Sequence, residues 1–203
     1  PLASEYIQIL NFTGLTTADQ IQYRIIATDS SDNSASIPPV GFIQIAVLSA
    51  DNPVSTYLND FNSATTDFTL NYFAQSQPTG FANQGIHSLH PYPVGFGTAT
   101  SSNFNLIVKK PITVTTSNPY VVFDEIAVVE YSGTNVKDFV VVEASTNLGD
   151  TWVPLTSPYG ALSDPQWRSS FDNNGTPNSS LFRTRIVKLT DHPSITGGST
   201  VHV

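Results

Sequence analysis

Three carboxylates of this chain stand at positions that suit metal binding. Asp124 and Glu125 interrupt an apolar run, and Asp60 lies near the start of the same segment. Carboxylates at strand ends, together with backbone carbonyls, are ligands that Ca²⁺ prefers, so these residues are candidates for one structural calcium site. The alternative is that the adjacent pair binds neighbouring loops, Arg183 or Arg185. Adjacent strand residues point to opposite faces, so Asp124 and Glu125 cannot act as acid and base on one bond.

Three aromatic side chains are candidates for ligand contacts with a sugar ring. Prolines on both sides stiffen the loop at Tyr92, Phe96 follows on that loop, and Trp167 lies further along the chain. The alternative for all three is packing in the core. His87 and His90 share the loop, but no helix aligns them. We therefore expect their imidazoles to bond backbone carbonyls rather than a metal ion.

The stretch from Ser145 to Trp152 matches an Asp-box turn, Ser-x-Asp-x-Gly-x-Thr-Trp, with Asn147 in the place of the Asp. Asn147 can bond backbone amides of its own turn, and Gly149 can supply a positive φ angle. Thr151 and Trp152 would begin the return strand. Sialidases carry several such boxes, together with an arginine triad, on a six-bladed propeller. A chain of 203 residues with one box is too short for that fold, so we expect a structural turn.

The composition excludes several classes of function. The net charge is -8, from 8 Lys+Arg against 16 Asp+Glu, which argues against binding of nucleic acid or of anionic membrane surfaces. No apolar run approaches the ~20 residues that a membrane helix needs. The absence of Cys excludes thiol catalysis, thiolate metal sites and disulfides. There is no Gly-x-Ser-x-Gly elbow and no glycine-rich phosphate loop, so we expect no enzyme activity.

The first segment, residues 1–52, has the alternation of a sheet with one buried face. Apolar residues recur at every second position around 7–9, 21–27 and 43–47, which predicts three strands. Three strands are too few for an independent sandwich, so we expect the rest of this domain upstream of Pro1. The run from Asp19 to Asp29, followed by Asn33 and Pro38-Pro39-Val-Gly41, resembles the last strands of an immunoglobulin-like or fibronectin III-like module.

The second segment, residues 53–203, predicts a jelly-roll-like β-sandwich with one short helix. The runs 121–123 and 139–142 are apolar at every position, as in central strands of a stacked sandwich. Asp164 as a cap, with Pro165 at the first helical position, predicts a helix through Phe171. One or two more strands would follow Leu189 in such a sandwich, but the stretch from Ser194 to Val203 is short and polar, so we expect the last strands to be missing.

The order of several pieces of the second segment also supports a family resemblance. The pieces are Asp60-Phe61, Gly85 to Pro93, Lys110-Pro-Ile112, Phe123 to Ala127, Val129-Glu130, Asp138 to Ser145, Thr151-Trp152, Tyr159-Gly160, Trp167, Leu181 to Arg185 and Leu189. This order resembles a sandwich module near the C-terminus of large surface proteins that the bacterial type IX secretion system exports. It is also similar to MAM-like and galactose-binding-like jelly rolls attached to secreted peptidases.

The resemblance implies an extracellular or cell-surface location and no catalytic residues. We therefore expect a non-catalytic module pair of a secreted or surface-displayed bacterial protein, serving adhesion, spacing or accessory binding. Its partners would be neighbouring domains of the same polypeptide, a glycan, or the secretion and surface-anchoring machinery. The alternatives are a carbohydrate-binding module and an accessory fragment of a secreted peptidase. Beyond the candidate calcium ion, the sequence points to no cofactor.

Overall fold

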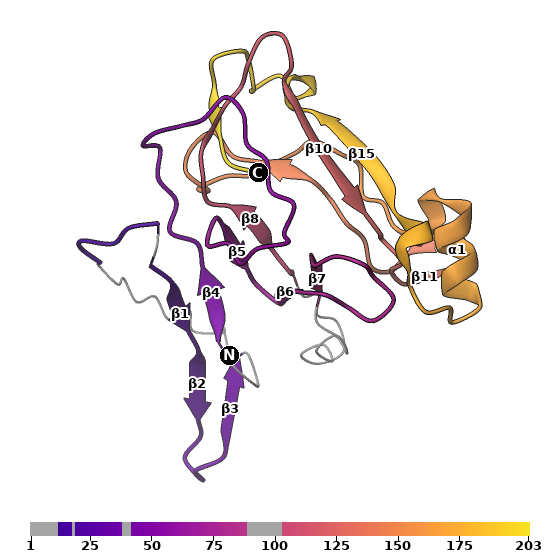
Figure 1. Cartoon of the computed structure of the whole chain (residues 1–203). Helices are drawn as coiled ribbons and strands as arrows, with labels where there is room; N and C mark the ends of the chain where they lie inside the picture. Colours follow the sequence, from indigo (N-terminus) through magenta and orange to yellow (C-terminus); the bar gives the residue numbers. More distant parts are fainter. Residues whose placement is uncertain (1–11, 18, 38–41, 89–102) are drawn as a thin grey trace. The chain divides into compact units, whose positions relative to one another are not determined.

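The computed structural model describes residues 12–17, 19–37, 42–88 and 103–203 (Figure 1). The chain divides into two compact units, Pro1–Val47 and Leu48–Val203. Strands dominate the described part of both units, and that of the second also contains one short α-helix. The prediction of an all-β fold with one short helix is therefore confirmed.

The described residues of the first unit form two antiparallel strand pairs. Strand β1 (Ile21–Tyr23) pairs with β4 (Ile43–Ile45), and β2 (Ile25–Thr28) pairs with β3 (Ser34–Ile37). In the β2–β3 turn the Asp29 carboxylate accepts hydrogen bonds from the backbone N–H groups of Ser31 and Asn33, at 2.8 and 3.0 Å.

Both faces of the β2–β3 ribbon carry exposed isoleucine. Ile25 and Ile26 are consecutive, so they point to opposite faces, and each is more than half exposed. Two-stranded ribbons are at best marginally stable alone in water. The described residues of this unit therefore do not form a closed core around the ribbon.

The strands of the second unit also pair two by two, all antiparallel. The pairs are β5 (Phe68–Leu70) with β8 (Leu106–Val108), β6 (Phe73–Ser76) with β7 (Gly85–Ser88), β9 (Ile112–Thr113) with β16 (Thr200–Val201), β10 (Tyr120–Glu125) with β15 (Arg183–Lys188), β11 (Tyr131–Ser132) with β12 (Asn135–Val136), and β13 (Glu143–Ala144) with β14 (Val153–Pro154). Isolated bridges add the contacts Val54–Ile112, Val140–Tyr159 and Ser145–His202.

Two apolar clusters form the core of the second unit. The first consists of Val114, Ala144, Leu189, Ile195 and Val201. The second consists of Ala127, Tyr159, Ala161, Trp167 and Leu181. Residues 194–203, which the sequence suggested to be short and polar, thus supply two members of one cluster, Ile195 and Val201, and the strand β16.

Two apolar runs that suggested central strands are less buried than predicted. Along β10 exposed and partly buried residues alternate, and the Val122 side chain is exposed. Phe139 is also exposed, and residues 140–142 form one isolated bridge instead of a long strand. The expectation that both faces of these runs are buried was wrong, because β10 has one face open to solvent and the Phe139 side chain of the second run is exposed.

Helix α1 (Pro165–Asp172) begins where the sequence predicted. The Asp164 carboxylate accepts hydrogen bonds from the backbone N–H groups of Gln166 and Trp167, at 2.8 and 3.0 Å, and Pro165 occupies the first helical position. Arg183 of β15 donates to the other Asp164 oxygen at 2.7 Å, which joins the helix start to the strand. Three short 3₁₀ turns complete the described elements: Ala161–Ser163, Ser179–Leu181 and Leu189–Asp191. No helix among the described residues has the length and apolarity needed to span a membrane.

Candidate functional site

The Asp-box stretch is a hairpin turn between β13 and β14 that its own side chains close. The Ser145 hydroxyl accepts from the Gly149 N–H at 2.8 Å and donates to Asn147 Oδ1 at 2.9 Å. Asn147 Oδ1 accepts from the Thr151 N–H at 3.0 Å, and Asn147 Nδ2 donates to the Thr151 hydroxyl at 2.9 Å. These bonds occupy the polar groups of the turn with one another, which is the arrangement of a structural turn.

The box is also tied to the core. Gly149 has φ of +83°, and a Cβ atom there would lie 3.2 Å from a Leu48 methyl carbon and 3.6 Å from the Trp152 ring. Ser145 exchanges two backbone hydrogen bonds with His202, at 2.9 and 3.0 Å. The His202 side chain is buried, and its Nε2 atom has no hydrogen-bond partner among the described residues. Burial lowers the pKa of His202, and the nearby backbone of Ser49 and Lys109 partly opposes this.

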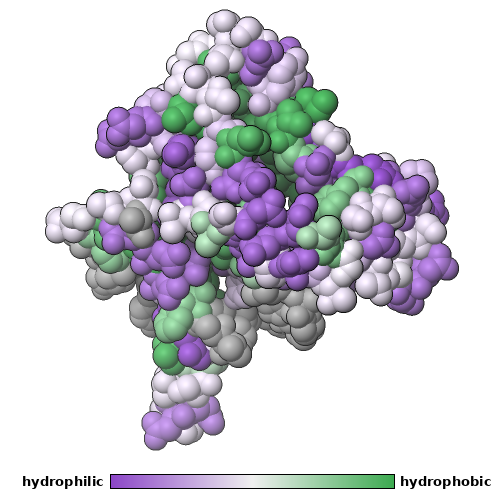
Figure 2. Space-filling model, viewed as in Figure 1, coloured by the Kyte–Doolittle hydropathy of each residue, from purple (hydrophilic) through white to green (hydrophobic). Residues whose placement is uncertain are grey.

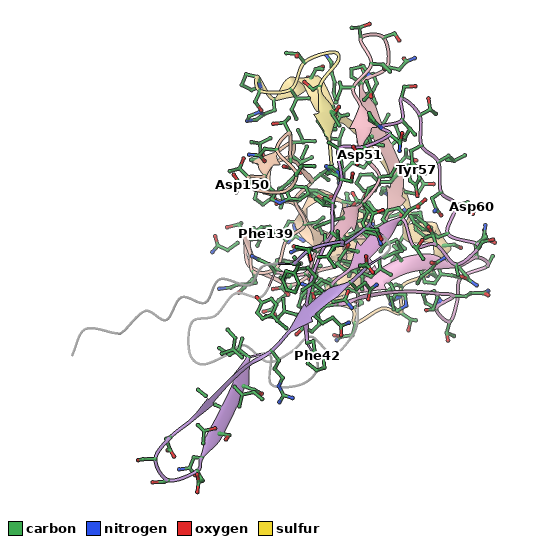
Figure 3. The ribbon with its side chains drawn as sticks, turned by 90° about the vertical axis from the view of Figure 1, so that its left-hand side faces the viewer. Phe42, Asp51, Tyr57, Asp60, Phe139 and Asp150 are labelled. Carbon is green, nitrogen blue, oxygen red and sulfur yellow. The ribbon has the colours of Figure 1, made fainter. Side chains whose placement is uncertain are left out.

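The three carboxylates proposed for calcium have separate protein partners. Asp124 accepts from the Thr184 hydroxyl at 2.6 Å, and Asp60 accepts from the Asn62 N–H at 3.1 Å on an exposed loop (Figure 3). Glu125 bonds Arg185 and accepts from a tyrosine hydroxyl. In the described part of the chain, no group of three or more His, Asp or Glu side chains is placed to hold a metal ion. The structure therefore does not gather these three side chains into one group, and a calcium site at any of them stays a prediction.

Glu125 belongs to a triad with Arg185, which is partly exposed, and Tyr159, which is buried. The Arg185 guanidinium lies 3.5 Å from the Tyr159 ring centroid and forms an ion pair with Glu125. The Tyr159 hydroxyl donates to Glu125 at 2.8 Å. Burial raises the pKa of Tyr159, and the Glu125 carboxylate raises that pKa further. A tyrosine with a raised pKa beside an ion-paired carboxylate holds a structure together and is unsuited to proton transfer near neutral pH.

Of the three aromatic residues proposed as ligand contacts, the structure describes only Trp167. Trp167 is 1% exposed, and its indole N–H donates to the Leu181 carbonyl at 2.7 Å. Its assignment as a ligand contact was wrong, because the ring lies inside the core, where a sugar cannot reach it. Tyr92 and Phe96 lie outside the described residues. His87 bonds the Ser76 hydroxyl at 2.7 Å and the Ser88 carbonyl oxygen at 3.1 Å.

An open, shallow pocket of about 440 Å³ lies between α1 and the loop that follows it. Its wall is uncharged and consists of Gln166, Ser169, Ser170, Asn173, Gly175, Thr176, Asn178, Ser180 and Leu181. Internal bonds fix part of this wall: Asn173 Nδ2 donates to the Ser169 carbonyl at 2.7 Å, and Asn178 caps the turn at Ser180. The only sequence signal for this pocket is the run of Ser, Asn and Gly at 169–180, a composition that is equally typical of an ordinary surface loop.

A second surface is the outer face of the β10–β15 ribbon. Tyr120, Val122 and Ile186 are 48%, 57% and 66% exposed, and Val122 and Ile186 are cross-strand partners. Hydrophobic residues gather over these two strands on the face shown in Figure 2. Lys188 lies opposite Tyr120 at one end of the ribbon, and Asp124 lies opposite Thr184 at the other.

No family model, curated protein or solved structure matches this chain. The geometry of these surfaces therefore carries the functional argument.

Proposed function

We propose that this chain is a non-catalytic, extracellular module pair of a secreted or surface-displayed bacterial multidomain protein, and that it serves accessory binding. The resemblance of residues 60–189 to exported sandwich modules supports the location. The observation that carries the binding role is the uncharged pocket beside α1.

The chemistry of the pocket favours a neutral, polyhydroxylated ligand, of which a saccharide is the natural example. Side-chain amides and hydroxyls both donate and accept hydrogen bonds, as sugar hydroxyls do. No carboxylate, imidazole or ammonium group lines the wall, so the pocket offers neither an acid–base pair nor a counter-charge for an ionic ligand. The pocket is shallow and open, so we expect weak affinity, with a Kd on the order of 1 mM.

The test is a titration of the isotope-labelled chain with neutral oligosaccharides, followed by NMR. We expect saturable shifts of the backbone amides of residues 166–181 at millimolar ligand. Ser169→Tyr places a ring in the pocket and should abolish these shifts. Ser157→Tyr, an exposed serine outside the pocket wall, should leave them unchanged. If no saccharide moves these amides, or if Ser169→Tyr binds as the parent does, the pocket is not a saccharide site.

A second candidate role is contact with a neighbouring domain through the first unit. The observation that favours it is the exposure of Ile25 and Ile26 on opposite faces of the β2–β3 ribbon. We expect the amides of this ribbon to exchange with solvent rapidly in the present chain, and slowly in a longer form of the protein that supplies the covering surface. Equal exchange in both forms would exclude this role for the ribbon.

A further inference from the structure

We infer that the outer face of the β10–β15 ribbon is a self-association surface, which binds the same face of a second copy of this chain. The face presents three rows of cross-strand pairs. Val122 and Ile186 form the middle row, and both are more than half exposed. Cross-strand apolar pairs of this kind are normally covered by another layer of structure, and an exposed apolar patch marks an interaction surface.

The charges at the two ends of the face identify the occupant. Lys188 lies in the row with Tyr120, and Asp124 lies in the row with Thr184, so one end of the face is basic and the other acidic. The rows are about 7 Å apart, because residues in a strand rise by about 3.4 Å. A face with an apolar centre and opposite charges at its ends is complementary to itself when turned end over end.

A two-fold axis across the middle row produces this arrangement. The rotation places the Asp124 end of one copy over the Tyr120–Lys188 end of the other, while Val122 and Ile186 meet their own counterparts. Interfaces with two-fold symmetry repeat every contact, so two Asp124–Lys188 pairs form. Packed sheets lie about 10 Å apart, a gap that a lysine and an aspartate side chain can bridge together. Lys188 is free to turn toward Asp124 of the other copy, since its ion pair with the exposed Asp191 is a loose contact of 3.7 Å.

The size of the face sets the strength of the association. Two strands of six residues cover about 10 by 20 Å, so a dimer buries roughly 400 Å² in total, below the ~1,200 Å² of a standard interface. We therefore expect a Kd of about 0.1 to 1 mM in solution. Copies displayed side by side on one surface would associate much more strongly, because their effective concentration is high.

Sedimentation equilibrium of the whole chain between about 10 μM and 1 mM, a range that spans the expected Kd, tests the inference. The weight-average mass of the parent should rise with concentration. Ile186→Asp should remain monomeric over this range, and Leu58→Asp should associate as the parent does, because Leu58 is 89% exposed but lies outside the face. If the parent is monomeric at 1 mM, or if Ile186→Asp still associates, the inference is wrong and the face serves another partner or none.

A charge exchange tests the orientation. Asp124→Lys and Lys188→Glu should each weaken association about fivefold, since each places two like-charged pairs in the interface. The double variant should restore the Kd of the parent. Failure of the double variant to recover would contradict the end-over-end arrangement. Circular dichroism of each variant confirms that its monomer is folded.

Discussion

Removal of the buried Ser145 hydroxyl should measurably lower the free energy of unfolding of the second unit. Ser145 is almost fully buried, and its hydroxyl accepts from the Gly149 N–H at 2.8 Å and donates to Asn147 at 2.9 Å. A third contact, from the Asn147 N–H, is longer at 3.3 Å. In Ser145→Ala the Gly149 N–H loses its partner inside a turn whose backbone cannot easily rearrange, because Leu148 and Gly149 both have positive φ.

The magnitude follows from these contacts. Each good hydrogen bond contributes about 1 kcal/mol net, so the loss of two predicts about 2 kcal/mol of destabilisation. For a unit of this size, that lowers Tm by about 4 to 8 °C. Both tryptophans of the chain, Trp152 and Trp167, belong to this unit, so tryptophan fluorescence during urea unfolding reports on it directly.

A matched variant in the same turn is the control. Asn147→Asp restores the common Asp-box residue and retains the acceptor for the Thr151 N–H. The Thr151 hydroxyl can then donate to the new carboxylate instead of accepting from the amide. We expect Asn147→Asp to change the free energy of unfolding by about 0.5 kcal/mol or less. A loss below about 0.5 kcal/mol for Ser145→Ala would refute the view that the serine hydroxyl holds this turn.

Three further predictions concern the core of the same unit. Burial lowers the pKa of His202, so as pH falls through about 6.5 this histidine is protonated first in the unfolded chain, and the free energy of unfolding should fall. His202→Gln should lose this pH dependence when urea unfolding is compared at about pH 7.5 and 5.5. Trp167→Phe should cost about 2 to 3 kcal/mol by urea unfolding followed by circular dichroism, because it leaves a gap and an unbonded Leu181 carbonyl; a loss under about 1 kcal/mol would contradict this. Tyr159→Phe should cost about 1 kcal/mol in the same assay while the Arg185–Glu125 ion pair remains, and an unchanged stability would mean that the hydroxyl bond to Glu125 contributes nothing.

Features governed by neighbouring residues could be predicted from the sequence. Asp164 and Pro165 mark the start of α1, and the Asp-box spacing led us to expect the turn that Ser145 and Asn147 form. Such elements are decided by local hydrogen bonds and by the allowed φ angles, which the residue types specify.

Features governed by residues far apart in the chain could not be predicted from the sequence. An exposed and a buried tryptophan look alike in sequence, and Trp167 is buried because Leu181 and Tyr159 close over it. The sequence left Arg185 open as a partner of Glu125, which the ion pair confirms, but it gave no sign of the bond to Tyr159, 34 residues further along the chain. The open face at Val122 was missed for a similar reason, since a run of valines does not reveal which side another layer covers.

The pairing of β9 with β16 has a consequence for the order in which this unit assembles. Val201 pairs with Ile112, and it shares a cluster with Val114 and Ala144. The residues of this cluster that are synthesised early therefore depend for their burial on residues that are synthesised late. During synthesis, the region around Ile112 therefore lacks its β16 partner until residue 201 has emerged from the ribosome. Contacts between such distant residues fold slowly, because a long loop must close before they form. We therefore expect the cluster around Val114 to form late in the folding of this unit.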